Sequence, residues 1–124
     1  MPDNSTTIAD LRQRVRDFVD EREWQRFHTP KNLCMALSVE VAELVEHFQW
    51  LDAEESQARG QDPAFRAAVA EEVADVCCYL LSLVNTLGLD LSTAVVEKMQ
   101  KNARKYPADI FRGRFEAPSS PPGP

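Results

Sequence analysis

The chain has 124 residues and a formal net charge of −6, from 14 Lys and Arg against 20 Asp and Glu. This length suits one domain, and the acidic balance disfavours binding to nucleic acid or to an anionic membrane surface. No apolar run approaches the roughly 20 residues that span a bilayer, and the three cysteines form no CxxC pair, so we expect no disulfide framework and a reducing, cytoplasmic location.

Apolar residues recur at helical spacing in four segments of the chain. The first predicted helix covers about residues 8–19, and Thr7 with Asp10 three residues later resembles a capping box at its start. The second covers about residues 30–48 and opens on a Thr-Pro pair, which is typical of an N-cap followed by proline in the first turn.

The third predicted helix covers residues 63–87, opens on an Asp-Pro pair and stops at Gly88. The fourth runs from about 91 to 105 and ends before Pro107. Residues 53–62, between the second and third helices, are polar, and we expect an exposed, mobile connection there.

These segments predict an all-α protein, a four-helix bundle with short connections. The third helix is apolar over more than one stripe, so we expect another subunit to cover part of it and to complete the bundle by oligomerisation. Residues 1–107 form the predicted domain. Residues 108–124 end in APSSPPGP, which predicts a flexible Pro-rich tail.

Acidic residues interrupt the apolar sequence of the second and third helices. Glu40 and Glu43 form an ExxE pair, and Glu72 and Asp75 form an ExxD pair. A spacing of three places each pair on one helix face. If the two helices pack antiparallel, the four carboxylates converge, and their mutual repulsion favours a bound divalent cation. Oxygen ligands favour Mg²⁺, with Mn²⁺ as a substitute.

The acidic pairs have two other possible interpretations. The pairs could simply be solvated helix faces. A di-iron or di-manganese bundle would need two Glu-x-x-His motifs, and neither His28 nor His47 has a glutamate three residues before it. His47 lies on the face of Glu40 and Glu43 and is either a surface imidazole or an outer-shell partner.

Two further clusters accompany the acidic pairs. Residues 98–114 carry six basic side chains and one acid, which form either a solvated helix end or a set of phosphate ligands. Trp24, Phe27 and His28 lie between the first two helices, and Trp50 closes the second. These aromatic residues either fill the core or stack on a nucleobase.

The paired acids resemble the ExxE…ExxD signature of the all-α nucleoside triphosphate pyrophosphohydrolases, the MazG-like superfamily, and most closely its dCTP pyrophosphatase branch. The similarity extends over about residues 8–107. It includes the segments WQRFHTPKNLCMALSVEVAELVEHFQW, EEVADVCCYLL and VEKMQKNARKYP.

The resemblance implies hydrolysis of a nucleoside triphosphate, such as dCTP, to the monophosphate and pyrophosphate, with a role in removing unwanted nucleotides. It also implies a dimer or tetramer with sites completed across subunits. It assigns Mg²⁺ to the four acids. An acid that is not fully committed to the metal would take the proton of the attacking water, and we expect this residue to be Glu43 or Glu72. The implied nucleotide-binding residues are Trp24, His28 and Trp50 at the base, Tyr79 near the sugar or phosphates, and Lys98 and Asn102.

Two other functions stay open at this point. One is a non-catalytic helical interaction domain whose acidic pairs are solvated. The other is a phosphoribosyl-ATP pyrophosphohydrolase of the same superfamily.

Overall fold

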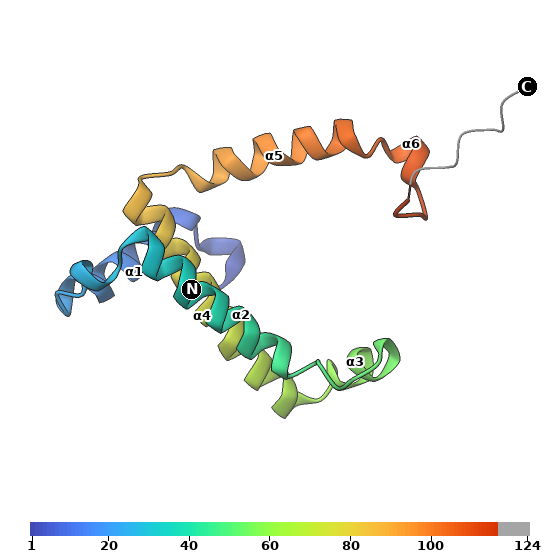
Figure 1. Ribbon diagram of the computed structural model, residues 1–124, viewed down its shortest axis with the longest axis horizontal. Coiled ribbons are helices and arrows are strands. Elements are labelled where there is room, and N and C mark those ends of the chain that lie inside the picture. The colour runs from blue at the N-terminus through green and yellow to red at the C-terminus, as the bar shows by residue number, and fades with distance from the viewer. Residues whose placement is uncertain (117–124) are drawn as a thin grey trace, which may run out of the picture. The chain divides into compact units, whose positions relative to one another are not determined.

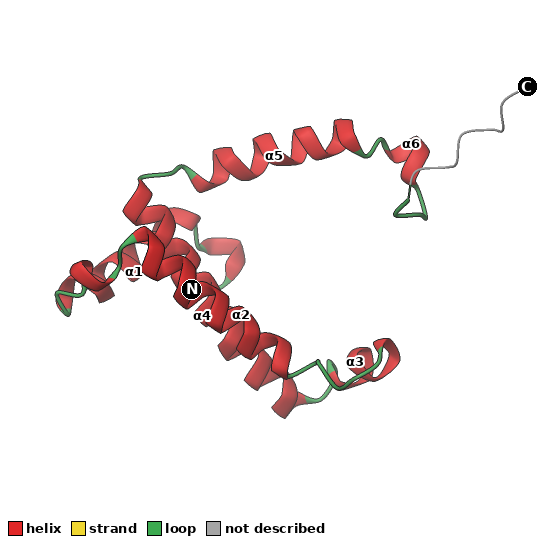
Figure 2. Ribbon diagram, in the orientation of Figure 1, coloured by secondary structure: helices red, strands yellow, loops and turns green. Residues whose placement is uncertain are grey.

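The computed structural model describes residues 1–116, and within that range every regular element is a helix (Figures 1 and 2). This confirms the predicted all-α class. Residues 117–124, the end of the predicted Pro-rich tail, lie outside the described range. The α-helices are α1 (Ile8–Glu21), α2 (Pro30–Glu46), α3 (Ala53–Arg59), α4 (Pro63–Leu87), α5 (Leu91–Lys105) and α6 (Ala108–Phe111), with 3₁₀ turns at Asp3–Ser5 and Gln25–Phe27.

The ends of the long helices follow the predicted capping signals. The Thr7 hydroxyl accepts from the Asp10 amide at 3.1 Å, and the Asp10 carboxylate accepts from the Thr7 amide at 2.9 Å. Thr29 and Asp62 cap α2 and α4 more simply, because each side chain accepts from the backbone amide three residues later, and each precedes a proline. Gly88 ends α4 with φ of 64°, a left-handed conformation that glycine adopts without a steric penalty. Local sequence therefore fixes where these helices begin and end.

The expected mobile connection at residues 53–62 is wrong, because most of it is the helix α3. The Asp52 carboxylate caps this helix by accepting from the Glu55 amide at 2.8 Å. Acidic residues occupy its first turn and Arg59 its last, the arrangement that the helix dipole favours. The segment is polar because it is an exposed helix, and the capping aspartate was the missed signal.

The start of the expected tail is also helical. Residues 108–111 form the short helix α6, which begins directly after Pro107. The Phe111 ring meets the Tyr106 ring edge-to-face at 5.2 Å. Aromatic packing across the proline therefore gives this segment a structure that its composition did not indicate.

The chain divides into two compact units, Met1–Leu89 and the segment that begins at Asp90. In the first unit, α2 and α4 pack side by side in opposite directions, and α1 packs against α4 (Figure 1). Its buried apolar core is small and consists of Leu33, Leu81 and Val84. The second unit contains α5 and α6.

Much of the apolar surface of the long helices stays exposed in the single chain. Large apolar side chains of α2 and α4 are about half exposed, including Met35, Val39, Val45, Val73 and Leu87. On α5, Val95, Val96 and Met99 are equally exposed. Exposed apolar area of this extent is typical of an interaction surface. Among the described helices, none combines the length and apolar character needed to cross a membrane.

Candidate functional site

The packing of α2 against α4 gathers three of the four predicted metal ligands. Glu40 and Glu43 lie one turn apart on α2, and Glu72 faces them from α4. One carboxylate oxygen from each of these residues lies within 4.8 Å of the others. The two helices therefore pack antiparallel, as the convergence of the acidic pairs requires, and this packing concentrates negative charge in one place.

Two of these carboxylates carry a buried oxygen with no hydrogen-bond partner in the described chain. These atoms are Oε2 of Glu40 and Oε2 of Glu72. Burial raises the pKa of Glu40, and the neighbouring Glu43 carboxylate raises it further. Burial and the charge of Glu43 also raise the pKa of Glu72. An ionised carboxylate with an unpartnered buried oxygen is unfavourable unless a cation or proton accompanies it.

Asp75 and His47 flank the three clustered glutamates. Asp75 is not one of the three closely grouped ligands, but its charge helps raise the pKa of both Glu40 and Glu72. His47 Nε2 lies 3.8 Å from Glu72 Oε1. This distance makes His47 a neighbour of one carboxylate rather than an isolated surface imidazole.

The donor set fits a hard divalent cation. It offers carboxylate oxygens from two helices, with the buried oxygens of Glu40 and Glu72 available. Mg²⁺ and Mn²⁺ take oxygen ligands of this kind, whereas structural zinc sites are built from cysteine and histidine. The two unpartnered oxygens decide the fit, because the oxygens of a carboxylate that was merely solvated would be exposed to water.

An aromatic cavity of about 520 Å³ opens beside the acidic cluster. Trp24, His28 and Tyr79 line it, and Asp75 belongs to the same wall. The His28 ring lies between the other two, with ring centroids 6.4 Å from Trp24 and 6.5 Å from Tyr79. Three residues predicted to contact a nucleotide therefore meet in one cavity, and Asp75 joins that cavity to the carboxylates.

Helix α1 supplies the opposite wall of the aromatic cavity. Val15, Phe18 and Val19, which belong to the apolar stripe of that helix, line the cavity instead of closing a dry core. Phe18 meets Trp24 edge-to-face at 5.8 Å. Arg14 completes this wall as an exposed cation. The apolar stripe of α1 that the periodicity predicts therefore lines the cavity in addition to packing against α4.

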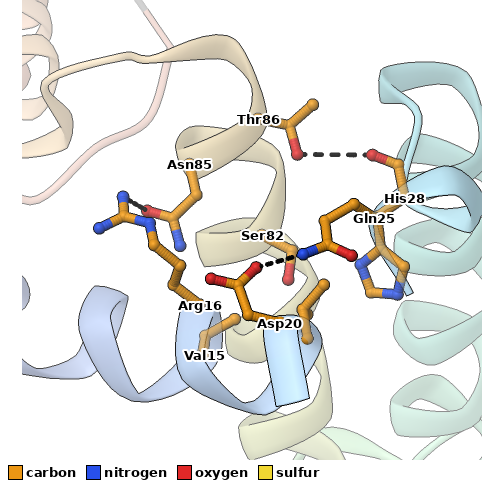
Figure 3. A pocket seen from close by; sticks show the side chains of 9 residues that line it. Val15, Arg16, Asp20, Gln25, His28, Ser82, Asn85 and Thr86 are labelled. Carbon is orange, nitrogen blue, oxygen red and sulfur yellow. Dashed lines mark hydrogen bonds between the residues drawn. The ribbon is translucent and has the colours of Figure 1, made fainter. Parts of the chain in front are cut away.

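A second cavity of about 310 Å³ shares part of its wall with the first (Figure 3). Val15, Val19, His28 and Ser82 line both spaces. The additional polar side chains of the second cavity are Arg16, Asp20, Gln25, Asn85 and Thr86. The two cavities therefore meet at His28 and Ser82.

The structure does not bring every predicted site residue into this cavity. Trp50 follows the far end of α2 from His28 and is 86% exposed, and a helix of this length extends about 25 Å. One chain therefore does not carry Trp50 to the cavity of Trp24. Lys98 and Asn102 lie on α5 in the second unit, so their contact with a nucleotide stays a prediction.

Sequence reasoning missed several residues that line the cavities. On α4, Cys78 and Ser82 line the aromatic cavity together with the predicted Asp75 and Tyr79. Their spacing of i, i+3, i+4 and i+7 is that of one helix face, so a polar stripe continuing from Asp75 could have identified Ser82. Asp20 and Gln25 carried no comparable signal, because the turn between them sets their position.

The cysteines are all unpaired in the structure, in line with the expectation of no disulfide framework. Burial raises the pKa of the Cys78 thiol, and Cys77 and Asp75 add to this effect. The thiol is therefore less reactive than an ordinary cysteine. Cys78 is best described as a small wall residue of the aromatic cavity.

Known proteins share both the sequence and the fold of this chain. The MazG-like family matches residues 35–114. Human dCTP pyrophosphatase 1 is 44% identical over 106 residues, 86% of this chain and 62% of the human protein. The bovine protein of the same name is 43% identical over 107 residues, 86% of this chain and 63% of the relative. The chain thus spans less than two thirds of the length of these curated relatives.

A solved structure agrees over a larger share of its own length. The crystal structure of a pyrophosphatase from Archaeoglobus fulgidus has a TM-score of 0.76 and 40% sequence identity to this chain. The match covers 86% of this chain and 98% of the archaeal one. The helical arrangement that presents the acidic cluster is therefore found in a protein of similar size.

Proposed function

The chain belongs to the MazG-like family, and on that basis we propose that it hydrolyses a nucleoside triphosphate to the monophosphate and pyrophosphate. The proposed substrate is a deoxynucleotide such as dCTP, in keeping with the name of the relatives. The proposed role is the removal of unwanted nucleotides from the cellular pool.

One observation carries this proposal. Three clustered carboxylates, two of which carry a buried oxygen with no partner, lie near an aromatic cavity. Asp75 lines that cavity, and its charge raises the pKa of Glu40 and Glu72. A nucleoside triphosphate has the matching chemistry, because its phosphates require cationic neutralisation and its base requires an aromatic surface. A solvated acidic face would need neither the buried oxygens nor the cavity.

In the proposed reaction Glu40, Glu43, Glu72 and Asp75 hold Mg²⁺, or Mn²⁺ in its place. A bound divalent cation supplies neutralisation of phosphate charge and polarisation of a water molecule. Glu43 or Glu72 accepts the proton of the attacking water. Glu72 is the better placed of the two, since its Oε2 has no other partner and His47 lies 3.8 Å from its Oε1.

The base lies in the aromatic cavity against Trp24 and His28, with Tyr79 toward the sugar or phosphates. Lys98 and Asn102 of α5 contact the nucleotide, and the basic residues of 98–114 stabilise charge on the departing pyrophosphate. Because Trp50 lies away from the cavity in one chain, its contact with the base requires a second copy. The exposed apolar side chains of α2, α4 and α5 support such a homo-oligomer, a dimer or tetramer.

The test is a substrate panel. The purified protein is incubated with Mg²⁺ and each of dCTP, dTTP, dUTP and dATP, and phosphate is detected with and without added inorganic pyrophosphatase. We expect phosphate only when the second enzyme is present, since pyrophosphate is the product, and no product in EDTA. Absence of product from every nucleotide, with the protein folded, would favour the non-catalytic interaction domain. Phosphoribosyl-ATP is assayed beside these four, and its turnover without turnover of any deoxynucleotide would identify the other branch of the superfamily.

A further inference from the structure

The turn that joins α1 to α2 carries a strained residue. In the described part of the chain, Glu23 is the one residue other than glycine with a positive φ, which is 51°. Its amide donates to the Asp20 carbonyl at 3.0 Å, and the next amide, that of Trp24, donates to the Val19 carbonyl at 3.1 Å. These two hydrogen bonds form a helix-ending turn that needs one left-handed residue. A Cβ at that residue crowds a carbonyl oxygen, so glutamate destabilises the turn.

The same backbone turn closes α4 without this strain. There the Leu89 amide donates to the Val84 carbonyl at 3.0 Å. The left-handed residue is Gly88, with φ of 64°, and glycine adopts this conformation freely. Of these two matching turns, the one with a side chain at the left-handed position is therefore the one that positions Trp24.

Few contacts hold the α1–α2 turn to the rest of the fold. Residues 20–27 are all exposed. Among the described residues, the hydrogen bonds of residues 22–27 all stay within residues 18–32. The first hydrogen bond to α4 comes at His28, whose backbone carbonyl accepts from the Thr86 hydroxyl at 3.4 Å (Figure 3). Exposed backbone with few buried contacts opens more readily than a packed core.

The two sides of the aromatic cavity are therefore held with different firmness. Helix α4 supplies Tyr79 to one side, and the same helix carries the buried core residues Leu81 and Val84. The turn supplies Trp24, which is 42% exposed and meets the Phe18 ring edge-to-face. Loss of the left-handed conformation breaks the hydrogen bond of the Trp24 amide and moves the indole away from the cavity.

We propose that this turn is a gate of the aromatic cavity. Trp24 moves aside to admit and release a nucleotide, and the strain at Glu23 sets how often it does so. That the ligand is a nucleotide rests on the proposed function. Glu23 does not line the cavity, so it is a positioning residue that acts through Trp24. The strain favours opening of the free and the occupied cavity alike, and it therefore changes the rates of entry and exit together without changing the affinity.

Amide hydrogen exchange of the full chain, in EDTA and without nucleotide, measures the opening directly. The protection factor of the Trp24 amide reports the strained turn, and that of the Leu89 amide reports the matching glycine turn. Glu23→Gly should raise protection at Trp24 roughly fivefold, the equivalent of about 1 kcal/mol, and leave Leu89 unchanged. Glu23→Ala removes the carboxylate but keeps the Cβ, so it should resemble wild type. An equal rise in Glu23→Ala, or at Leu89, overturns the gate.

Stopped-flow binding of dCMP, followed by tryptophan fluorescence, tests whether the gate serves a nucleotide. Glu23→Gly should lower the association and dissociation rate constants by the same factor, roughly fivefold, and leave Kd unchanged. Glu23→Ala should again resemble wild type. A change in Kd, or slower binding in Glu23→Ala, would mean that the side chain of Glu23 acts on the ligand, and this result overturns the gate.

The two measurements also distinguish failure of the gate from failure of the proposed function. A chain that hydrolyses dCTP, but shows the same Trp24 protection and the same dCMP rate constants in wild type and Glu23→Gly, overturns the gate and leaves the function standing. A chain that shows the expected protection but binds none of dCMP, dTMP, dUMP and dAMP overturns the proposed function and supports the mobile turn.

Discussion

Replacing Glu40 by glutamine tests the metal site directly. Glutamine keeps the shape of the side chain and removes its charge, so α2 should form unchanged. Glu40 provides one of the three oxygens that lie within 4.8 Å of one another, and its Oε2 is buried without a partner. Loss of one positioned electrostatic contact in an active site lowers turnover about 10²–10³-fold. We expect kcat for dCTP to fall by at least that factor, measured by coupled phosphate release at saturating Mg²⁺.

The same substitution should raise the melting temperature of the metal-free protein. The pKa of Glu40 is raised in the folded state by burial and by Glu43, so the folded protein binds this proton more tightly than the unfolded chain. The ionised carboxyl therefore destabilises the fold above its folded pKa, and this effect is relieved as pH falls through it. In EDTA, the advantage of Glu40→Gln over wild type should be present at pH 8 and shrink toward pH 5.

Mg²⁺ should reverse that order of stability. At a metal concentration a hundred times the dissociation constant, wild type gains about 2.7 kcal/mol, roughly 10 °C for a domain of this size. The variant should gain much less. Glu46→Gln, at the exposed end of the same helix, is the matched control and should resemble wild type in every assay. Turnover of Glu40→Gln within tenfold of wild type, with an unshifted response to Mg²⁺, would refute the metal assignment.

Three further predictions concern the rest of the site and the assembly. Light scattering at micromolar concentration should give a mass at least twice the 14.0 kDa of the chain, and a monomer would contradict the oligomer inferred from the exposed apolar faces. Trp50→Ala should cost about 1–3 kcal/mol of base stacking, a ten- to hundredfold loss in kcat/KM, with a changed ranking of dCTP, dTTP, dUTP and dATP. An unchanged ranking, with activity following only the folded fraction, would make Trp50 structural. Lys98→Ala should raise the KM for triphosphates more than the control Lys31→Ala on α2 does. Equal increases in KM would show that Lys98 does not belong to the site.

The fold was predictable where local signals are strong. Thr7, Thr29 and Asp62 indicate where helices begin, because their side chains accept hydrogen bonds from backbone amides that have no partner within the helix. Gly88 indicates where α4 ends, because glycine readily adopts the left-handed conformation of a helix C-terminus. Helix α3 escaped prediction because its seven residues contain no apolar stripe. A short exposed helix depends on its cap and end charges, and the same polar composition also describes a loop.

The acidic cluster was predictable because a spacing of three places each acidic pair on one helix face. Antiparallel packing of the two helices then brings those faces together. The cavities were not, since their walls combine one face of α1, one face of α4 and the turn at Trp24. Ser82 shows the limit clearly. In the sequence it is one small residue in an apolar helix, and only its place in the wall of both cavities distinguishes it.

The position of Trp50 links the oligomer to the site. In one chain, Trp50 lies past the carboxyl end of α2, while Trp24 and His28 lie before its amino end. A two-fold pairing is self-complementary, so two copies of α2 packed antiparallel would each bring their carboxyl end to the other's amino end. The exposed Val39 and Val45 of α2 supply apolar surface for such a pairing. One arrangement would then cover these side chains and place the second copy's tryptophan toward the aromatic cavity. Val39→Glu places a charge in this pairing surface and should therefore have two effects together. The mass of the particle should fall to that of a smaller assembly, and Trp50→Ala should no longer change the ranking of bases.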